Sequence, residues 1–195
     1  MNTLIINLKH RQDRFEHITN EIKKLSNVIS NVYRVEAIID ETRTAFKSHK
    51  QCIRIAKERK WPYVLILEDD AMFEDNANDI LLRSVNEIQN HNWDVLYLGA
   101  SLLAHTTRVS DCLIKLTHAY ALHAYIVNSQ MYDTILNLPQ IYEMDVHYNL
   151  IMPQHNMYMC DPMIAYQMPN YSDLQNGYRD YNAAMKEAYS ELKPR

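Results

Sequence analysis

Residues 63–70 read YVLILEDD, five largely apolar residues followed by three carboxylates. An apolar run of this length is typical of a parallel strand that helices cover on both faces. Three adjacent acids repel one another, and a divalent cation such as Mn²⁺ or Mg²⁺, which prefers oxygen ligands, would offset that repulsion. The alternative is a solvated turn, because charge runs are usually exposed. The buried strand before the acids favours a metal site at Glu68, Asp69 and Asp70.

The segments around this stretch alternate between strand and helix patterns. Strands are expected at 2–8, 32–39, 63–67, 94–98 and 119–127, and helices from the polar cluster after residue 8 through residue 25 and at 44–60, 75–90, 129–138, 144–151 and 181–192. Residues 100–118 have the pattern of a loop or a hairpin. The alternation predicts an α/β fold with a central, mostly parallel sheet flanked by helices, in which ligands collect beyond the carboxyl ends of the strands.

Length and composition indicate one globular domain. The chain has 195 residues, 47% of them hydrophobic and 23% charged, which is typical of a protein with a packed core. We expect a single domain over 1–195, whose tail after about residue 174 forms a loose C-terminal helix. Only two glycines occur, Gly99 and Gly177, which excludes a glycine-rich dinucleotide loop and a Walker-type phosphate loop.

Charge and cysteine content exclude further classes. The net charge is -4, so the chain is not expected to bind nucleic acid. Its apolar runs are too short to cross a membrane, and no secretion signal is recognisable at the start, so we expect a cytoplasmic location. The three cysteines are widely spaced, which predicts reduced thiols and no structural zinc site.

Several motifs, in order, resemble glycosyltransferase family 25. They are IINLKHRQDR (5–14), SHKQCIRIA (48–56), LILEDDA (65–71), YLG (97–99), HAYALHAYIVN (118–128), DVHYN (145–149) and YQMPNYSD (166–173). The resemblance spans roughly residues 3–173. That family includes bacterial lipooligosaccharide galactosyltransferases and collagen hydroxylysine galactosyltransferase domains. The resemblance implies a Rossmann-like GT-A fold, a UDP-sugar donor, dependence on Mn²⁺ and inversion at the anomeric carbon.

The resemblance also implies residues that bind the donor. Those matching the N-terminal nucleotide-binding motif are Asn7, Leu8, Arg11 and Arg14. A guanidinium suits this role because it binds phosphate oxygens or stacks on a base, although exposed charges at a helix start would give the same pattern. The matching Ser-His pair is Ser48 and His49. A helical histidine is as often a packed, hydrogen-bonded residue, so both interpretations of His49 stay open.

Within the acidic motif, Asp70 and then Asp69 match the metal-facing positions, and Glu68 is expected to support the loop or contact ribose. Either His147 or His155 would complete the metal site. Further donor contacts are expected from Gln167, Ser172 and Asp173.

Inverting transfer needs a carboxylate that removes the proton of the acceptor hydroxyl. The resemblance points to Asp145, at the start of a late helix whose N-terminus favours a negative charge, with Glu143 in reserve. The alternative role for Asp145 is a helix N-cap.

These features predict an inverting, metal-dependent hexosyltransferase of lipopolysaccharide or other glycan biosynthesis, of bacterial or viral origin. Galactose is the favoured sugar, while glucose and N-acetylglucosamine stay open. The acceptor would be a hydroxyl of a glycan, a lipid-linked saccharide or a protein. Two rivals are a catalytically inactive module that binds nucleotide sugars or carbohydrate, and a Mg²⁺-dependent phosphoryl hydrolase, which needs more converging acids.

Overall fold

The computed structural model describes residues 1–39, 44–101, 104, 106–172 and 177–192. The strands are β1 (Asn2–Asn7), β2 (Asn31–Glu36), β3 (Tyr63–Glu68), β4 (Ala71–Phe73), β5 (Val95–Tyr97), β6 (Thr107–Ser110), β7 (Leu113–Lys115), β8 (Ala124–Asn128), β9 (Met157–Cys160), β10 (Ala165–Gln167), β11 (Asn170–Ser172) and β12 (Gly177–Arg179). The helices are α1 (Gln12–Glu21), α2 (Thr44–Glu58), α3 (Ala77–Ile88), α4 (Tyr132–Asn137), α5 (Met144–Ile151) and α6 (Asn182–Glu191). Short 3-10 turns lie at Ile22–Leu25, Ser129–Met131 and Met152–Gln154.

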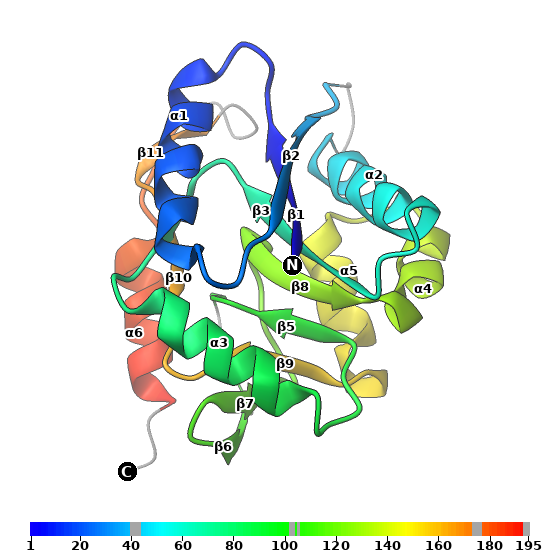
Figure 1. Cartoon of the computed structure of the whole chain (residues 1–195), viewed down its shortest axis with the longest axis vertical. Coiled ribbons are helices and arrows are strands. Elements are labelled where there is room, and N and C mark those ends of the chain that lie inside the picture. Colours follow the sequence, from blue (N-terminus) through cyan, green and yellow to red (C-terminus); the bar gives the residue numbers. More distant parts are fainter. Residues whose placement is uncertain (40–43, 102–103, 105, 173–176, 193–195) are drawn as a thin grey trace.

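One eight-stranded sheet organises the described residues, in the order β2-β1-β3-β8-β5-β9-β7-β6. β1, β2 and β3 are parallel, as are β5 and β9, whereas β8 and β7 are antiparallel to their neighbours. The sheet is therefore mostly parallel in direction, as predicted, with β3 beside its centre (Figure 1).

Helices cover both faces of the sheet, which explains the continuous apolar run in β3. Figure 1 places α1 and α3 on one side of the sheet, and α2, α4 and α5 on the other. Within β3, Val64 and Ile66 pack in the core beneath α2, while Leu65 and Leu67 pack in the core beneath α3. Because successive strand residues point to opposite faces, a strand between two helical layers must be apolar at every position.

Two backbone features adjust the predicted boundaries. α2 ends in a pair of hydrogen bonds from Trp61 N to Ala56 O and from Lys60 N to Lys57 O, with Lys60 in the left-handed region at φ 54°. This is the Schellman pattern, which stops a helix before Pro62. The strand predicted at 119–127 begins later, at Ala124, because Ala121 has a φ of 69° and interrupts the extended backbone.

Two small ladders build up the rim beyond the carboxyl ends of β3 and β5. β4 pairs with β10, and β11 pairs with β12, both antiparallel. β10 crosses so close to Gly99, just after β5, that a Cβ at Gly99 would lie 1.9 Å from Ala165 O. A glycine is therefore required where these two backbones meet.

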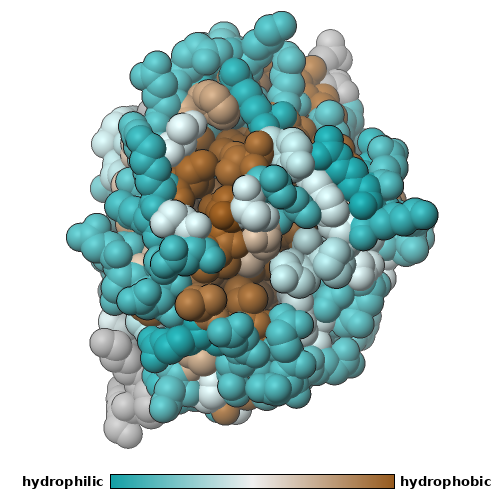
Figure 2. All heavy atoms as spheres, in the orientation of Figure 1, coloured by the Kyte–Doolittle hydropathy of each residue, from teal (hydrophilic) through white to brown (hydrophobic). Residues whose placement is uncertain are grey.

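The face drawn toward the viewer carries a shallow apolar hollow over the sheet, visible as the brown centre of Figure 2. The side chains that line this hollow include Met1, Tyr63, Trp93, Leu96 and Ile126. Met1, Tyr63 and Trp93 lie at or next to the amino ends of their strands, so the hollow is distinct from the opposite sheet edge where the acids lie. Among the described residues, no helix combines the length and apolarity that a membrane crossing requires.

Candidate functional site

The acidic residues lie where the predicted central strand ends. Glu68 is the last residue of β3, and Asp69 and Asp70 form the turn that leads into β4. The backbone N–H of Met168, just after β10, donates to Asp70 O at 2.7 Å. The small β4–β10 ladder thus fixes the far side of this turn, at the carboxyl edge of β1, β3 and β5.

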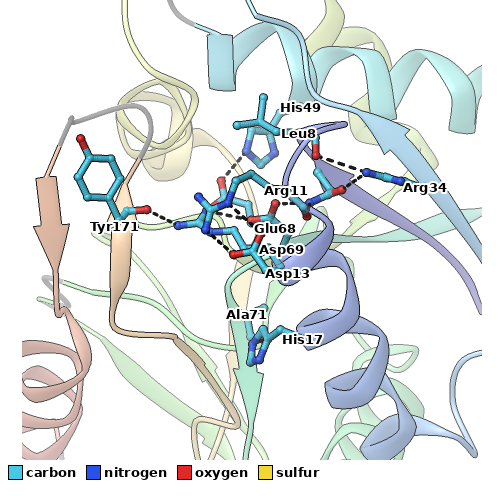
Figure 3. A network of polar contacts seen from close by, with 12 residues as sticks. Leu8, Arg11, Asp13, His17, Arg34, His49, Glu68, Asp69, Ala71 and Tyr171 are labelled. Atoms are coloured by element: carbon cyan, nitrogen blue, oxygen red, sulfur yellow. Dashed lines mark hydrogen bonds and ion pairs between the residues drawn. The ribbon is translucent and has the colours of Figure 1, made fainter.

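Asp69 is the hub of a buried polar network that joins four parts of the chain (Figure 3). Its Oδ2 accepts a hydrogen bond from Asn7 Nδ2 at 2.6 Å, and its Oδ1 accepts one from Arg14 Nη1 at 3.0 Å. Arg14 Nη2 also donates to the backbone oxygen of Tyr171 at 2.7 Å. Burial raises the pKa of Asp69, although the bonds from Asn7 and Arg14 favour its ionised form. Asp69 and Arg14 therefore hold the turn, α1 and the β11 segment together.

Asp70 has a different environment from its neighbour. Its Oδ1 is buried and has no hydrogen-bond partner among the described residues. Burial, together with the negative charges of Glu68 and Asp69, raises the pKa of Asp70 to about 8. A buried carboxyl oxygen without a hydrogen-bond partner costs free energy unless a ligand compensates it, so half-buried Asp70 is the member of the acidic turn best suited to bind a cation.

Glu68 points to the opposite side of the turn, toward α2. His49 Nε2 lies 3.0 Å from Glu68 Oε1, and His49 Nδ1 lies 2.8 Å from the hydroxyl of Tyr125. Although burial opposes ionisation, the hydrogen bond and charge of His49 hold the pKa of Glu68 below its ordinary value. Burial raises the pKa of Tyr125 far above its usual range, so its hydroxyl stays protonated beside His49 Nδ1. His49 is therefore a packed histidine that also orients Glu68.

The loop after β1 brings the predicted nucleotide-binding residues beside the acidic turn. Leu8 O accepts a hydrogen bond from the backbone of Arg11, whose own carbonyl accepts one from Asn7 Nδ2. The Arg11 guanidinium pairs with both carboxylate oxygens of Asp13, at 3.0 and 2.8 Å. That pair holds the pKa of Asp13 at about 2, below its ordinary value. Arg11 thus lies at the site's rim, whereas Arg14 is buried within it.

The predicted base lies in the first turn of α5. Asp145 Oδ1 accepts a hydrogen bond from the backbone N–H of Val146 at 2.8 Å. The N-cap position belongs to Glu143, so Asp145 is not the N-cap. Burial raises the pKa of Tyr97 well above its usual range, and the nearby groups Tyr148 and Asp145 raise it further. Asp145 therefore lies near the carboxyl end of β5, on the α5 side of the sheet.

The two predicted histidine ligands occupy unrelated places. His147 is buried on α5, with its ring 5.4 Å from that of Phe46 and 5.5 Å from that of Tyr142. His155 bonds to Asp94 at 3.3 Å, at the amino end of β5 and thus at the opposite edge of the sheet. His155 precedes β9, which runs parallel to β5, so the structure places it at the amino edge of the sheet and away from the acidic turn.

No three histidine, cysteine, aspartate or glutamate side chains converge as metal ligands anywhere in the described ranges. The structure therefore does not assemble Asp69, Asp70 and His147 into one ligand set. Any cation here would take most of its ligands from substrate and water.

The remaining predicted donor residues that the structure describes lie at the same rim. Ser48 Oγ accepts a hydrogen bond from the backbone N–H of Ile38 at 3.0 Å, beyond the end of β2. Gln167, in β10, is paired with Ala71, the residue that follows Asp70. Ser172 ends β11. Asp173 lies outside the described residues, so its role stays a prediction.

A sequence model of glycosyltransferase family 25, described as an LPS biosynthesis protein, matches residues 40–149, more than half of the chain. The chain belongs to glycosyltransferase family 25. The match includes the Ser48-His49 pair, the acidic turn and Asp145. No curated protein sequence matches this family member.

Solved structures show that this family 25 member has a GT-A fold. A197 from STIV has 11% sequence identity and a TM-score of 0.55, with 87% of each chain covered. A glycosyltransferase involved in the glycosylation of the major capsid of PBCV-1 has 11% identity and a TM-score of 0.51, with 99% of this chain and 98% of that chain covered. UDP-glucose pyrophosphorylase in complex with UDP-glucose has 8% identity and a TM-score of 0.52, with 97% of this chain and 78% of that chain covered.

Three residues of this family 25 site were missed by sequence reasoning. Tyr125 bonds to His49, and Arg34 contacts the loop after β1. His123 is fully buried next to the acidic turn, its carbonyl accepts a hydrogen bond from Glu68 N, and burial lowers the pKa of its ring. A charge within the apolar strand pattern at 32–39 was the available signal for Arg34. Tyr125 and His123 look like ordinary strand residues.

Proposed function

We propose that this family 25 member is an inverting, metal-dependent hexosyltransferase that uses a UDP-sugar donor. One observation carries the proposal: Asp70 is half-buried at the carboxyl edge of the sheet, its Oδ1 is buried without a hydrogen-bond partner among the described residues, and its pKa is raised. In open α/β sheets this edge is where ligands bind, and a divalent cation with a diphosphate would satisfy the buried carboxyl group.

The residues present fit a Mn²⁺ or Mg²⁺ ion held mainly by Asp70. Asp69 is the weaker candidate, because both of its oxygens already accept hydrogen bonds. Such an ion, when bound, neutralises charge that develops on the departing diphosphate. Glu68, whose Oε1 lies 3.0 Å from His49 Nε2, would accept a hydrogen bond from the ribose hydroxyls. Arg11 lies at the rim, and in this proposal its guanidinium binds the donor phosphates.

The proposed transfer step is a direct displacement. The oxygen of an acceptor hydroxyl forms a bond to the anomeric carbon while the bond from that carbon to the diphosphate breaks. UDP leaves with the electron pair, and the hydroxyl proton passes to the carboxylate of Asp145. Its position supports this role, because Asp145 lies in the first turn of α5 and its Oδ1 accepts a hydrogen bond from the N–H of Val146. Glu143, the residue immediately before α5, is the reserve base.

Galactose is the proposed sugar, and the proposed acceptor is a hydroxyl of a glycan or protein. The family description as an LPS biosynthesis protein supports a saccharide acceptor. The choice of hexose depends on a few hydrogen bonds to one sugar hydroxyl, which a donor screen measures directly.

The proposal is tested by release of UDP from UDP-galactose, UDP-glucose and UDP-N-acetylglucosamine, each with and without Mn²⁺. We expect Mn²⁺-dependent release, fastest from UDP-galactose, and a loss of at least ~10²-fold in Asp70→Ala. Turnover by Asp70→Ala at the parent rate would contradict the metal assignment. Metal-independent UDP binding without turnover by the parent would favour an inactive binding module.

A further inference from the structure

We propose that Arg34, on β2, is a positioning residue that sets the orientation of the Asn7 side-chain amide and thereby the geometry of the acidic turn. This inference rests on the proposed function only for its consequence in UDP binding. The residue lies on the strand next to β1, opposite Ile5 in the register, and its guanidinium extends toward the carboxyl end of β1 (Figure 3).

The Asn7 amide has two chemically different ends, and each has a matching partner. Arg34 Nη2 lies 2.5 Å from Asn7 Oδ1, while Asn7 Nδ2 donates to Asp69 Oδ2 at 2.6 Å and to Arg11 O at 3.1 Å. A guanidinium only donates hydrogen bonds, and an ionised carboxylate only accepts them. An amide that lies between them can therefore satisfy both partners in one orientation only.

Turning the Asn7 side-chain amide by 180° would create two unfavourable contacts at once. Asn7 Nδ2 would then face the guanidinium of Arg34, and Asn7 Oδ1 would face the carboxylate of Asp69. Asn7 is 1% exposed, so water cannot readily compensate either contact. Without Arg34, the contact at Oδ1 disappears and one of the two constraints on the amide is lost.

Arg34 makes further contacts that hold its guanidinium in place, and these favour arginine over lysine here. Arg34 Nη2 also donates to the carbonyls of Leu8 and Lys9, at 3.3 and 3.2 Å. Arg34 Cζ lies 4.5 Å from the ring centroid of Phe15 on α1. The stacked, planar fork thus ties β2, the loop after β1 and the start of α1 together, whereas an ammonium would keep a donor but lose the stacking geometry.

The direct test is the NMR signal pair of the Asn7 side-chain NH₂, identified by its disappearance in Asn7→Ser. We expect these signals to shift and to exchange faster with solvent in Arg34→Ala, and to return only part of the way to parent values in Arg34→Lys, which keeps a donor but loses the planar fork. The matched control is Arg59→Ala, because Arg59 also stacks on aromatic rings, those of Tyr33 and Trp61, but lies away from the site. Unchanged Asn7 signals in Arg34→Ala would overturn the proposal.

A second measurement follows UDP affinity in the presence of Mn²⁺. We expect Arg34→Ala to raise the Kd by ~10-fold, as when partners outside a metal's own ligands are removed, and Arg34→Lys to recover part of the loss. Parent affinity in Arg34→Ala would overturn the link from the amide to the donor site. If the parent itself does not bind UDP, the proposed function fails, while the NMR result still decides whether Arg34 positions Asn7.

Should Arg34→Ala not fold, the comparison of Arg34→Lys with the parent supplies the same readout. A lysine that leaves the Asn7 signals and the UDP Kd unchanged would contradict the argument for a planar fork. A lysine that shifts both, with a melting temperature equal to that of Arg59→Ala, would support it.

Discussion

Asn7 Nδ2 lies 2.6 Å from Asp69 Oδ2, which joins the end of the first strand to the acidic turn 62 residues later in the chain. Arg14 Nη1 occupies the other oxygen of the same carboxylate. As a result, two adjacent aspartates differ in their contacts: both oxygens of Asp69 accept hydrogen bonds from the protein, whereas Asp70 Oδ1 has no hydrogen-bond partner among the described residues. The following predictions rest on this difference.

Replacing Asp69 should destabilise the fold more than replacing Asp70. Asp69→Ala leaves the buried charge of Arg14 without its carboxylate partner, and removing one partner of a buried ion pair costs roughly 3–5 kcal/mol. Urea unfolding measures the difference, and the double variant Asp69→Ala/Arg14→Leu should recover much of the loss. Strictly additive effects of the two substitutions would contradict the coupling between Asp69 and Arg14.

Metal-free protein should lose stability through Asp70 as the pH rises. In the unfolded chain the pKa of Asp70 is near its ordinary value of 3.8, whereas in the folded protein it is about 8. Between these values the folded state binds more protons than the unfolded state, so stability falls as pH rises, and below pH 4 the effect is absent.

Asp70→Asn removes this penalty. The difference in Tm between Asp70→Asn and the parent should therefore increase by several degrees from pH 5 to pH 8. A change of 1 kcal/mol moves Tm by roughly 2–4 °C in a protein of this size. Asp75→Asn is the control, because the Asp75 side chain is fully exposed. A difference between Asp70→Asn and parent that does not change with pH would refute the raised pKa.

Gly99→Ala should destabilise the protein, because the new Cβ would lie 1.9 Å from Ala165 O. Moving β10 away costs about 1–3 kcal/mol, as in other overpacked sites, and would also displace the end of the acidic turn. Gly177→Ala is the matched control, since its nearest neighbour is the flexible side chain of Arg179 at 3.0 Å. Equal chemical denaturation midpoints for Gly99→Ala and the parent would argue against this close crossing.

Asp145→Asn should retain UDP affinity while sugar transfer falls by ~10² or more, because an amide cannot take the acceptor proton. The asparagine keeps an oxygen for the N–H of Val146, so α5 should stay intact. Glu143→Gln is the control and should stay near the parent rate. If Glu143→Gln lost transfer and Asp145→Asn did not, the base would be Glu143.

Much of the fold was predictable from local sequence pattern. The apolar run in β3 needed helices on both faces, and Val64 and Leu65 indeed pack in different cores. Residues 100–118 contain the β6–β7 hairpin, one of the two structures expected there. β4, β10 and β11 were missed because each has only three residues, and their pairing is set by tertiary contacts.

The sequence predicted which residues lie together at the candidate site better than it predicted what each of them contacts. Because successive residues along a strand point to opposite faces, Glu68 faces His49 and Asp69 faces Asn7. Arg14 was expected to meet donor phosphates, yet its terminal nitrogens bind Asp69 and the Tyr171 carbonyl. Such a partner 157 residues away leaves no local trace in the sequence.

The central claim, that Asp70 anchors a cation and the donor's diphosphate, is tested by calorimetric titration of UDP with and without Mn²⁺. The account predicts binding by the parent that requires Mn²⁺, loss of that binding in Asp70→Asn, and its retention in Asp75→Asn. Equal, Mn²⁺-dependent affinity of Asp70→Asn and the parent for UDP would contradict it.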